Sequence, residues 1–218
     1  MPESQIQSAP LSRAEGKQRS RQKLITATIN SIAKRGFADT TLARVAEGAG
    51  LSRGIVNFHF RTKDALFLET LKYMAREYRE NWFRAFDAAG PSPADKLEAT
   101  LMCDFDPPVS NRNRIAVWFA FYGEAKSRPT YMKECTESDN VIHNTLINLC
   151  QALIDEGDYE DHNAHAIALG LSSIVEGLWL DNLLNTGVVT LEHGREVVRS
   201  YLKALFPKHF PRNQGAAN

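Results

Sequence analysis

The chain is 218 residues long and contains 26 Lys and Arg against 26 Asp and Glu, a formal net charge of zero. Hydrophobic residues make up 43% of the sequence, enough for a folded core, which excludes a disordered chain, a collagen-like repeat and a disulfide-held miniprotein. Taken alone, the neutral total also argues against a nucleic-acid-binding protein, since such proteins carry a basic excess.

The charge is unevenly distributed along the chain. Residues 1–64 contain eleven Lys and Arg and five Asp and Glu, a net charge of +6, and the remaining residues contain fifteen and twenty-one, a net charge of −6. A basic segment followed by an acidic body indicates that the basic segment binds a polyanion.

The cysteines and the N-terminus bear on the cellular compartment. Cys103, Cys135 and Cys150 are odd in number and form no Cys-x-x-Cys motif, so neither a disulfide framework nor a zinc site is indicated. The N-terminus lacks the apolar core of a signal peptide, and no apolar run approaches the roughly 18 residues of a membrane span. We therefore expect a cytoplasmic protein with no metal, no cofactor and no membrane partner.

Apolar residues that recur every three or four positions, together with capping residues, predict an all-α protein of about nine helices. No segment shows the alternation of apolar and polar residues that is typical of a strand. A flexible basic arm is expected at residues 1–16 and a disordered tail at 211–218. In chain order, helices are predicted at about 17–35, 41–48, 52–60, 62–89, 93–103, 112–127, 129–156, 163–186 and 191–206.

Residues 40–60 are the most informative segment, because two short helices joined by a tight glycine-containing turn describe a helix-turn-helix. Its small core would be formed by Val45, Ala46, Leu51, Ile55 and Val56. Thr40 and Thr41 would lie at the positive end of the first helix, where a phosphate can bind. The second helix would present Ser52, Arg53, Gly54, Asn57 and His59 to the major groove of DNA. A three-helix bundle with a solvated basic face accounts for the same periodicity equally well.

Residues 18–74 resemble the DNA-binding domain of the TetR family of transcriptional repressors. The resemblance rests on Gly36-Phe37, Thr40-Thr41, Val45-Ala46, Ala49-Gly50-Leu51-Ser52, Phe58-His59-Phe60 and Lys63-Asp64-Ala65-Leu66. It implies a homodimer that binds a pseudo-palindromic operator and releases it when a small molecule enters the helical body. The expected domains are a helix-turn-helix DNA-binding domain at 17–64 and a ligand-binding and dimerisation domain at 65–210.

The resemblance also implies which residues contact DNA. Together with the argument from the helix ends, the predicted contacts are Thr40, Thr41, Arg44, Ser52, Arg53, Gly54, Asn57, Phe58, His59 and Lys63. Arg can bond a guanine edge and Asn an adenine edge, whereas Lys63 is placed to hold a backbone phosphate. Phe58 stands where the family more often has tyrosine, and so lacks a hydroxyl that often reaches phosphate.

A second resemblance covers the body, to the choline-sensing repressors of betaine synthesis, the BetI branch of the family. It rests on residues 117–129, on 176–180 and on the helix segment 21–25. The resemblance implies a small cationic ligand such as choline or a related quaternary ammonium or sulfonium compound. Glu176 stands where that branch has aspartate and Tyr122 where tryptophan is frequent, which leaves the identity of the ligand open.

The body also carries aromatic residues and acids suited to such a ligand. A quaternary ammonium donates no hydrogen bond, so it is recognised by aromatic faces and by a nearby carboxylate. Residues three to four positions apart on a helix share a face. On this basis the predicted ligand-binding residues are Tyr78, Trp82, Trp118, Phe121, Tyr122, Glu176 and Trp179. The alternative is that these aromatic residues simply form the core.

The last two predicted helices suggest how two copies associate. Residues 166–184 are apolar on nearly every face, so this helix is expected to be buried on both sides and, with the helix at 191–206, to form the dimer interface. A monomeric core is the alternative. Two copies would then place their recognition helices about 34–36 Å apart, one turn of DNA.

The leading hypothesis is thus a ligand-responsive repressor that is not an enzyme. Three alternatives remain: a multidrug or aromatic-ligand sensor that controls efflux, an all-α enzyme, and a DNA-packaging protein without sequence preference. The enzyme is disfavoured because no nucleophile and base occur at a readable spacing. An acidic and histidine-containing stretch at 158–165 is interpreted as a solvated helix start rather than a metal site.

Overall fold

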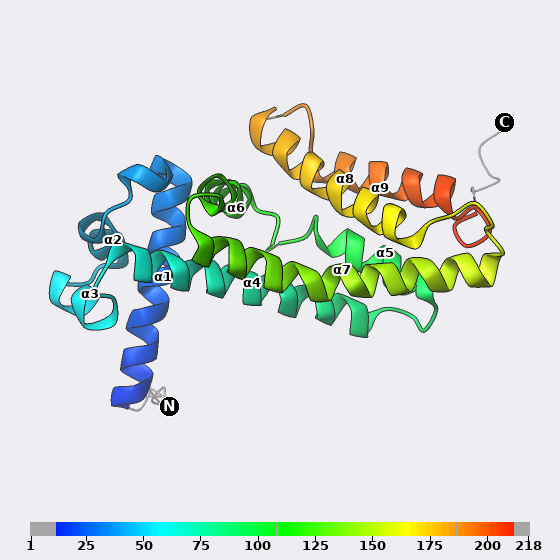
Figure 1. Cartoon of the computed structure of the whole chain (residues 1–218). Coiled ribbons are helices and arrows are strands. Elements are labelled where there is room, and N and C mark those ends of the chain that lie inside the picture. The colour runs from blue at the N-terminus through cyan, green and yellow to red at the C-terminus, as the bar shows by residue number, and fades with distance from the viewer. Residues whose placement is uncertain (1–11, 108, 186, 212–218) are drawn as a thin grey trace, which may run out of the picture. The chain divides into compact units, whose positions relative to one another are not determined.

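The structure, a computed structural model, describes residues 12–107, 109–185 and 187–211, without the side chains of 135 and 137–139. Within these residues every regular element is an α-helix (Figure 1), which confirms the all-α prediction. The helices are α1 (Arg13–Asp39), α2 (Leu42–Ala49), α3 (Arg53–His59), α4 (Lys63–Ala88), α5 (Pro93–Cys103), α6 (Arg112–Ala125), α7 (Pro129–Gly157), α8 (Ala164–Leu184) and α9 (Leu191–Leu205).

The chain divides into two compact units, Met1–Thr70 and Leu71–Asn218, and the division falls inside α4. Most of the predicted arm at 1–16, and all but residue 211 of the predicted tail at 211–218, lie outside the described residues. The described part of the arm is not a loop, because α1 already begins at Arg13. Ser12 caps it, accepting a hydrogen bond from the backbone of Glu15 at 3.2 Å while the Glu15 carboxylate accepts one from the backbone of Ser12 at 2.8 Å.

In the first unit α1 contacts both α2 and α3. The predicted end of α1 at Gly36 coincides with a break in the helix, where this glycine has φ +81°. Gly50 ends α2 in the left-handed conformation with φ +63°, a backbone geometry that glycine adopts readily. The turn therefore has the geometry that a helix-turn-helix requires.

The core of this motif differs in part from the prediction. Val45, Ala46 and Val56 are buried as expected, and Leu51 is half-buried. Ile55 was expected inside but is 37% exposed. Ser52 caps α3 in the predicted way, and the buried Val56 then fixes which side of this short helix faces inward, leaving Ile55 on the outer side.

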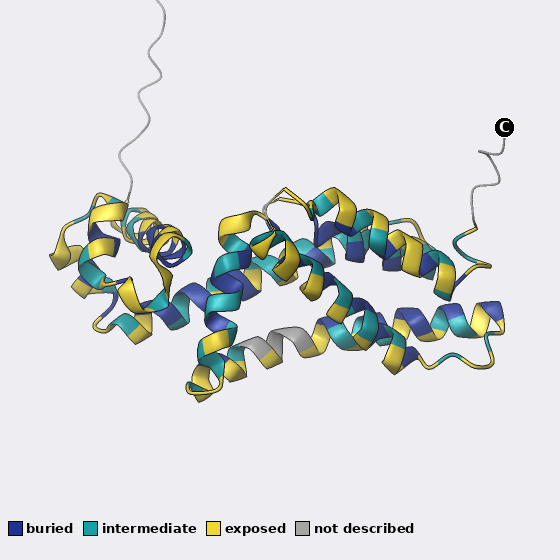
Figure 2. Ribbon diagram, turned by 90° about the horizontal axis from the view of Figure 1, so that it is seen from above, coloured by how far each residue is buried: buried dark blue, intermediate teal, exposed yellow. Residues whose placement is uncertain are grey.

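The second unit contains α5 to α9 and the longer part of α4. Buried residues recur along these helices (Figure 2) and include the large side chains of Trp82, Phe105, Phe121, Tyr131 and Phe206. α8 packs against α6, α7 and α9, and α5 packs against α7 and α9. These helices share one buried interior, to which α8 contributes side chains between α6, α7 and α9.

α8 is more exposed within one chain than the sequence suggested. Among the described residues it is the one helix that is long and apolar enough, by length and composition alone, to cross a membrane, although only 22% of that window is buried. The sequence had been expected to hold no such run. Leu169, Leu180 and Leu184 are exposed on α8, as is Tyr201 on α9. The expected burial on both sides is therefore not provided by this chain alone.

Candidate functional site

The exposed side of α3 carries most of the predicted DNA contacts. Ser52, Arg53, Gly54, Asn57 and Phe58 are all exposed on this helix or at its start. The side chains of Arg53 and Asn57 lie one helical turn apart and line the same small hollow, together with Leu42 and Ala43 of α2. This arrangement gives α3 two neighbouring side chains that can bond the edges of bases.

The two threonines before α2 have different environments. Thr41 is exposed and caps α2, its hydroxyl accepting a hydrogen bond from the backbone of Arg44 at 3.3 Å, and a hydroxyl that accepts one bond can still donate another to a phosphate. Thr40 is fully buried, donates to the carbonyl of Gly36 at 2.9 Å and lies 3.0 Å from the hydroxyl of Ser31. The prediction that the Thr40 side chain contacts DNA is therefore wrong, because this hydroxyl holds the end of α1.

Two of the predicted cationic contacts also have partners within the fold. The Lys63 ammonium donates to the carbonyls of Phe37 at 2.9 Å and Ala38 at 3.0 Å, and it lies 5.0 Å from the ring centre of Phe67. The guanidinium of Arg44, which is exposed, donates to the carbonyl of Asp39. Lys63 thus neutralises carbonyls left open at the end of α1, in addition to any phosphate that it binds.

α1 adds cations beside the end of α3 that the sequence reasoning did not assign to the site. Nε2 of His59 lies 2.7 Å from the hydroxyl of Ser20, and the ammonium of Lys17 lies 5.4 Å from the ring centre of Phe58, a side chain that is 69% exposed. Partial burial, with the positive charges of Lys17 and Arg21, lowers the pKa of His59. Helical spacing along α1 alone does not reveal this cluster, because it forms only when α1 packs against α3.

The second unit contains a cavity of about 310 Å³ that is partly open to solvent. Six of the seven predicted ligand-binding residues line it: Tyr78, Trp82, Trp118, Tyr122, Glu176 and Trp179. Phe121 does not line it; this residue is fully buried and its ring meets that of Tyr131 edge to face, with the centroids 5.5 Å apart. The prediction for Phe121 is therefore wrong, and the residue belongs to the core.

The aromatic rings of this cavity hold one another in place. The ring of Tyr78 meets those of Trp118 and Trp179 edge to face, at centroid distances of 6.3 and 6.2 Å. The rings of Trp118 and Tyr122 are 5.9 Å apart on neighbouring turns of α6. Aromatic faces from α4, α6 and α8 thus surround one volume, as a cage for a cation requires.

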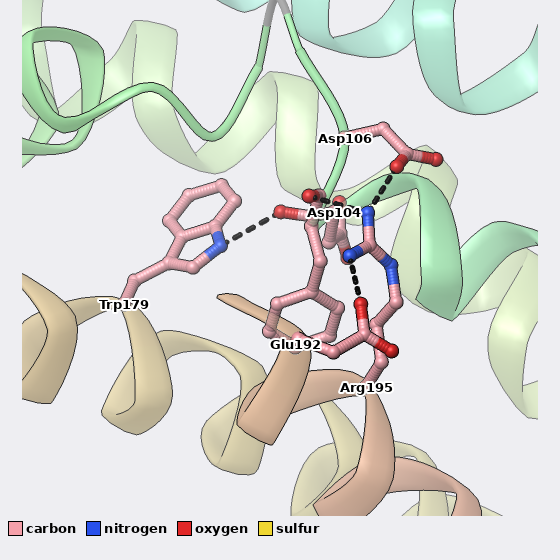
Figure 3. Close-up of polar contacts among 6 residues, drawn as sticks. Asp104, Asp106, Trp179, Glu192 and Arg195 are labelled. Carbon is pink, nitrogen blue, oxygen red and sulfur yellow. Dashed lines mark hydrogen bonds and ion pairs between the residues drawn. The ribbon is translucent and has the colours of Figure 1, made fainter. Parts of the chain in front are cut away.

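Asp104 is a lining residue that the sequence reasoning missed. It follows α5 directly and is only 4% exposed. Nε1 of Trp179 donates to its backbone carbonyl at 2.8 Å (Figure 3), and the hydroxyl of Tyr78 hydrogen-bonds to its carboxyl group. Oδ1 has no hydrogen-bond partner among the described residues. No sequence signal identifies such a residue, since an aspartate between a helix end and two prolines is typical of a turn.

The electrostatic character of the cavity is acidic. Burial raises the pKa of Asp104 to about 7, the hydrogen bond from Tyr78 opposing this increase and the negative charge of Glu176 adding to it. Partial burial also raises the pKa of Glu176, although this side chain lies on an exposed part of α8. The described residues that line the cavity include no Lys or Arg, and His143 is the only basic side chain among them.

The turn that carries Asp104 is fastened to α9. Arg195 donates to the carbonyl of Phe105 at 2.8 Å and to the carboxylate of Asp106, and a further bond joins it to Glu192 at 2.7 Å (Figure 3). Phe105 is buried directly against Gly194. The position of Asp104 therefore depends on α8 through Trp179 and on α9 through the residues that follow it.

The acidic and histidine-containing stretch at 158–165 does not form a metal site in the structure. Nε2 of His162 lies 2.8 Å from the carbonyl of Leu205, and the ring of Tyr159 packs on His162 and on Phe206. Across the part of the chain that the structure describes, no group of three or more His, Cys, Asp or Glu side chains is placed to hold a metal ion.

A helix-turn-helix with an exposed second helix, joined in sequence to a helical unit that contains a cavity, is the arrangement of a DNA-binding transcriptional regulator. Two family profiles match the chain: "Bacterial regulatory proteins, tetR family" over residues 24–70 and "BetI-type transcriptional repressor, C-terminal" over residues 93–207. The chain belongs to the TetR family of transcriptional regulators and has a BetI-type C-terminal domain. Its relatives are regulators and not enzymes.

Individual relatives agree with this assignment. The chain is 31% identical to the HTH-type transcriptional regulator BetI of Stenotrophomonas maltophilia (strain R551-3) over 182 residues, 84% of this chain and 90% of the relative. A putative transcriptional regulator from Pseudomonas aeruginosa PAO1 has a similar structure, with a TM-score of 0.77, 26% identity and coverage of 90% and 95%. One from Saccharomonospora viridis, solved in complex with choline, has a TM-score of 0.77, 18% identity and coverage of 85% and 96%, and so shares the fold.

Proposed function

We propose that this regulator is a repressor that binds a pseudo-palindromic operator as a homodimer and releases it when a small quaternary ammonium compound, such as choline, enters the cavity. The observation that carries the proposal is the composition of the cavity lining. It combines three tryptophans and two tyrosines with two carboxyl groups, and it contains no Lys or Arg. These are the groups that bind a cation without hydrogen-bond donors.

The size of the cavity favours a small ligand over a large flat one. About 310 Å³ is at the lower end of the range for ligand pockets, which runs from roughly 300 to 1,000 Å³. Each aromatic contact with a desolvated cation contributes about 0.5–2 kcal/mol, so several faces around one methylated ammonium give useful affinity. The choline complex of the Saccharomonospora viridis regulator makes choline the first ligand to test.

The homodimer is proposed from the exposed apolar surface of α8 and α9. Leu169, Leu180, Leu184 and Tyr201 are between 39% and 66% exposed in one chain. Large apolar side chains exposed on two helices that pack together indicate a site of association. A second copy would cover these side chains and supply two recognition helices for the two halves of a symmetric operator.

Ligand binding can change DNA binding only if the ligand has different affinities for two conformations of the dimer. In this proposal the ligand favours a dimer whose two recognition helices no longer match the spacing of the operator. Arg53 and Asn57 on α3 read the bases, Thr41 and Lys63 bind the phosphates, and the cation-binding cavity controls the spacing.

The test is a footprint of the full-length protein on the DNA upstream of its own gene, with and without choline, together with calorimetry. We expect a protected palindrome that choline removes. Coverage of the DNA without a footprint would indicate a packaging protein. Calorimetric binding of a flat aromatic cation but not of choline would indicate a multidrug sensor, and turnover of choline would indicate an enzyme.

A further inference from the structure

The carboxyl group of Asp104 has an unusual position in the cavity. Its backbone carbonyl is held by Trp179, and its carboxyl group is hydrogen-bonded by Tyr78. Asp104 lines the cavity, and its Oδ1 is buried without a partner among the described residues. A buried polar atom without a hydrogen bond costs free energy unless something else satisfies it. No described group donates a hydrogen bond to this oxygen, and the adjoining cavity of about 310 Å³ has room for a small cation.

We propose that Asp104, rather than Glu176, is the counter-charge of the bound cation, and that the cation enters as the Asp104 carboxyl group gives its proton to solvent. This inference rests on the proposed function, because it assigns the anionic group of the same cavity. It also predicts that the affinity of the sensor for its effector depends on pH.

Burial distinguishes the two acids. Asp104 is 4% exposed, so its charge acts through a medium of low polarity, where the attraction between opposite charges is strongest. Glu176 is on an exposed part of α8, where water and salt screen a charge. Glu176 also lies close enough to Asp104 to disfavour its ionisation. A positive charge beside Asp104 therefore stabilises its ionised form, and a quaternary ammonium supplies that charge.

The groups around Asp104 supply no such charge in the ligand-free protein. Two titratable side chains act on it directly, Tyr78 of α4 through a hydrogen bond and Glu176 of α8 through its charge. Cys103 of α5, Asp106 of the following turn and Tyr122 of α6 are the other titratable groups nearby. His143 of α7 lines the same cavity. Arg195 of α9 is engaged with the Phe105 carbonyl, Asp106 and Glu192. All but His143 and Arg195 are acids or weak acids, so they favour the protonated form of Asp104 when no cation is bound.

The proton balance follows from the pKa of Asp104, which burial raises to about 7. At pH 7 about half of the ligand-free molecules carry the Asp104 proton, so binding of choline, whose charge does not change, releases about half a proton per site. Only the ionised fraction of the protein binds the cation well. This fraction rises from about one tenth at pH 6 to about nine tenths at pH 8, so the affinity should rise roughly tenfold over this interval.

The experiment is isothermal titration calorimetry of the full-length protein with choline and with tetramethylammonium, at pH 6, 7, 8 and 9. Titration at each pH in phosphate and in HEPES, which differ in ionisation enthalpy, gives the number of protons released. We expect a roughly tenfold higher affinity at pH 8 than at pH 6, a release of about half a proton at pH 7, and almost none at pH 9.

Variants show which residue is responsible for the pH-dependent affinity and the proton release. Asp104→Asn should weaken binding by about tenfold or more at pH 8 and abolish proton release, because the amide keeps the shape but carries no charge. Glu176→Gln should change the affinity by less than about threefold, as expected for a screened charge. The pH dependence should remain but move to lower pH, because the Glu176 charge raises the pKa of Asp104. His143→Gln removes the lining histidine, and the pH dependence should remain. Asp155→Asn, an exposed acid on α7, is the matched control for charge removal.

The outcomes separate the two proposals. If the wild type binds neither choline nor tetramethylammonium at any pH, the proposed function and this inference both fail. If the wild type binds them with no proton release at pH 7, or if Glu176→Gln abolishes binding and Asp104→Asn leaves it intact, the inference alone is overturned. The proton measurement on the wild type needs no variant, so an unstable Asp104→Asn protein would not prevent a decision.

Discussion

The contact between Gly194 of α9 and Phe105 gives a prediction whose magnitude can be worked out from the structure. A Cβ atom added at Gly194 would lie 2.8 Å from Cδ1 of Phe105, 3.2 Å from Cζ and closer still to Cε1. Real Cβ atoms do not approach other atoms this closely, and Phe105 is only 1% exposed, so its ring has no free space into which to move. Gly194→Ala should therefore force the turn at 104–106 away from α9.

The expected cost combines two opposing contributions. Overpacking a buried contact of this kind costs about 1–3 kcal/mol, and three ring atoms within 3.2 Å place this case near the upper end. Replacing a helical glycine by alanine gains about 1 kcal/mol in helix propensity. Gly123→Ala on α6 makes the same chemical change, but with no atom within 4 Å of the added Cβ, so it should show the gain alone.

The difference between the two glycine variants isolates the clash. It should be about 3 kcal/mol, which corresponds to roughly 6–12 °C in melting temperature for a protein of this size. Thermal unfolding followed by circular dichroism measures it, and Phe105→Leu in the Gly194→Ala background should recover part of the loss. The choline affinity of Gly194→Ala should also fall, because Asp104 moves with the turn. Melting temperatures within about 1 °C of each other for the two variants would refute the reasoning.

Three further predictions concern the DNA-binding unit. Arg53→Ala should weaken binding to the operator about tenfold or more in gel-shift titrations and leave the affinity for random DNA nearly unchanged, since a bidentate contact with guanine discriminates by about 1–3 kcal/mol; equal losses on both DNAs would contradict this role. Lys63→Met should lower the urea midpoint as well as the DNA affinity, because the ammonium bonds the carbonyls of Phe37 and Ala38; an unchanged midpoint would argue against it. His59→Gln should reduce the loss of stability in acid. The lowered pKa of His59 keeps it neutral in the folded state while the unfolded chain takes up a proton, so its contribution is complete above the ordinary pKa of about 6.5 and is lost as the pH falls towards the folded value. Urea unfolding at pH 7.5 and 5.5 tests this, and an equal loss in variant and wild type would count against it.

The helices of this protein could be predicted because their ends are set by local chemistry. Ser52 accepts a bond from the backbone of Ile55 at 3.4 Å, Pro129 begins α7, and Gly50 ends α2 with positive φ, each where the sequence placed a boundary. α1 was predicted to begin at residue 17 because the apolar periodicity starts late, whereas the capping pair Ser12 and Glu15 begins it at Arg13. Periodicity reports the buried face of a helix, and a solvated first turn has none.

Helical spacing predicts which residues share the side of a helix that faces the ligand cavity, but not which of them line it. Trp118 and Tyr122, four positions apart, do share the face of α6 that lines the cavity. Phe121 is three positions from Trp118 but lies on the side that packs on Tyr131 of α7. Spacing restricts side chains to a broad stripe, and only the positions of the neighbouring helices decide which edge of that stripe faces a cavity.

The residues outside the helices could not be predicted in this way. Asp104 reaches the cavity because Trp179 binds its carbonyl and Arg195 binds the next one, over sequence separations of 75 and 90 residues. Thr40 and Thr41 are adjacent and chemically alike, and no sequence pattern distinguishes their roles. The structure does so because one residue caps α2 while the residue before it must face the end of α1.

The position of Asp104 also bears on how a ligand in the cavity could act on the rest of the protein. Without a cation, the chain carries the cost of a buried carboxyl oxygen that has no partner, and that cost is removed only when a positive charge arrives. The ligand therefore stabilises whichever arrangement of the turn at 104–106 places this oxygen against it. Trp179 holds this turn to α8 and Arg195 holds it to α9. Ligand binding at Asp104 therefore acts on the same two helices whose exposed leucines and tyrosine are proposed to join the two copies. Release of the operator requires that the ligand bind two dimer arrangements with different affinities. In this proposal that difference arises at one carboxyl group, through the two helices that hold it.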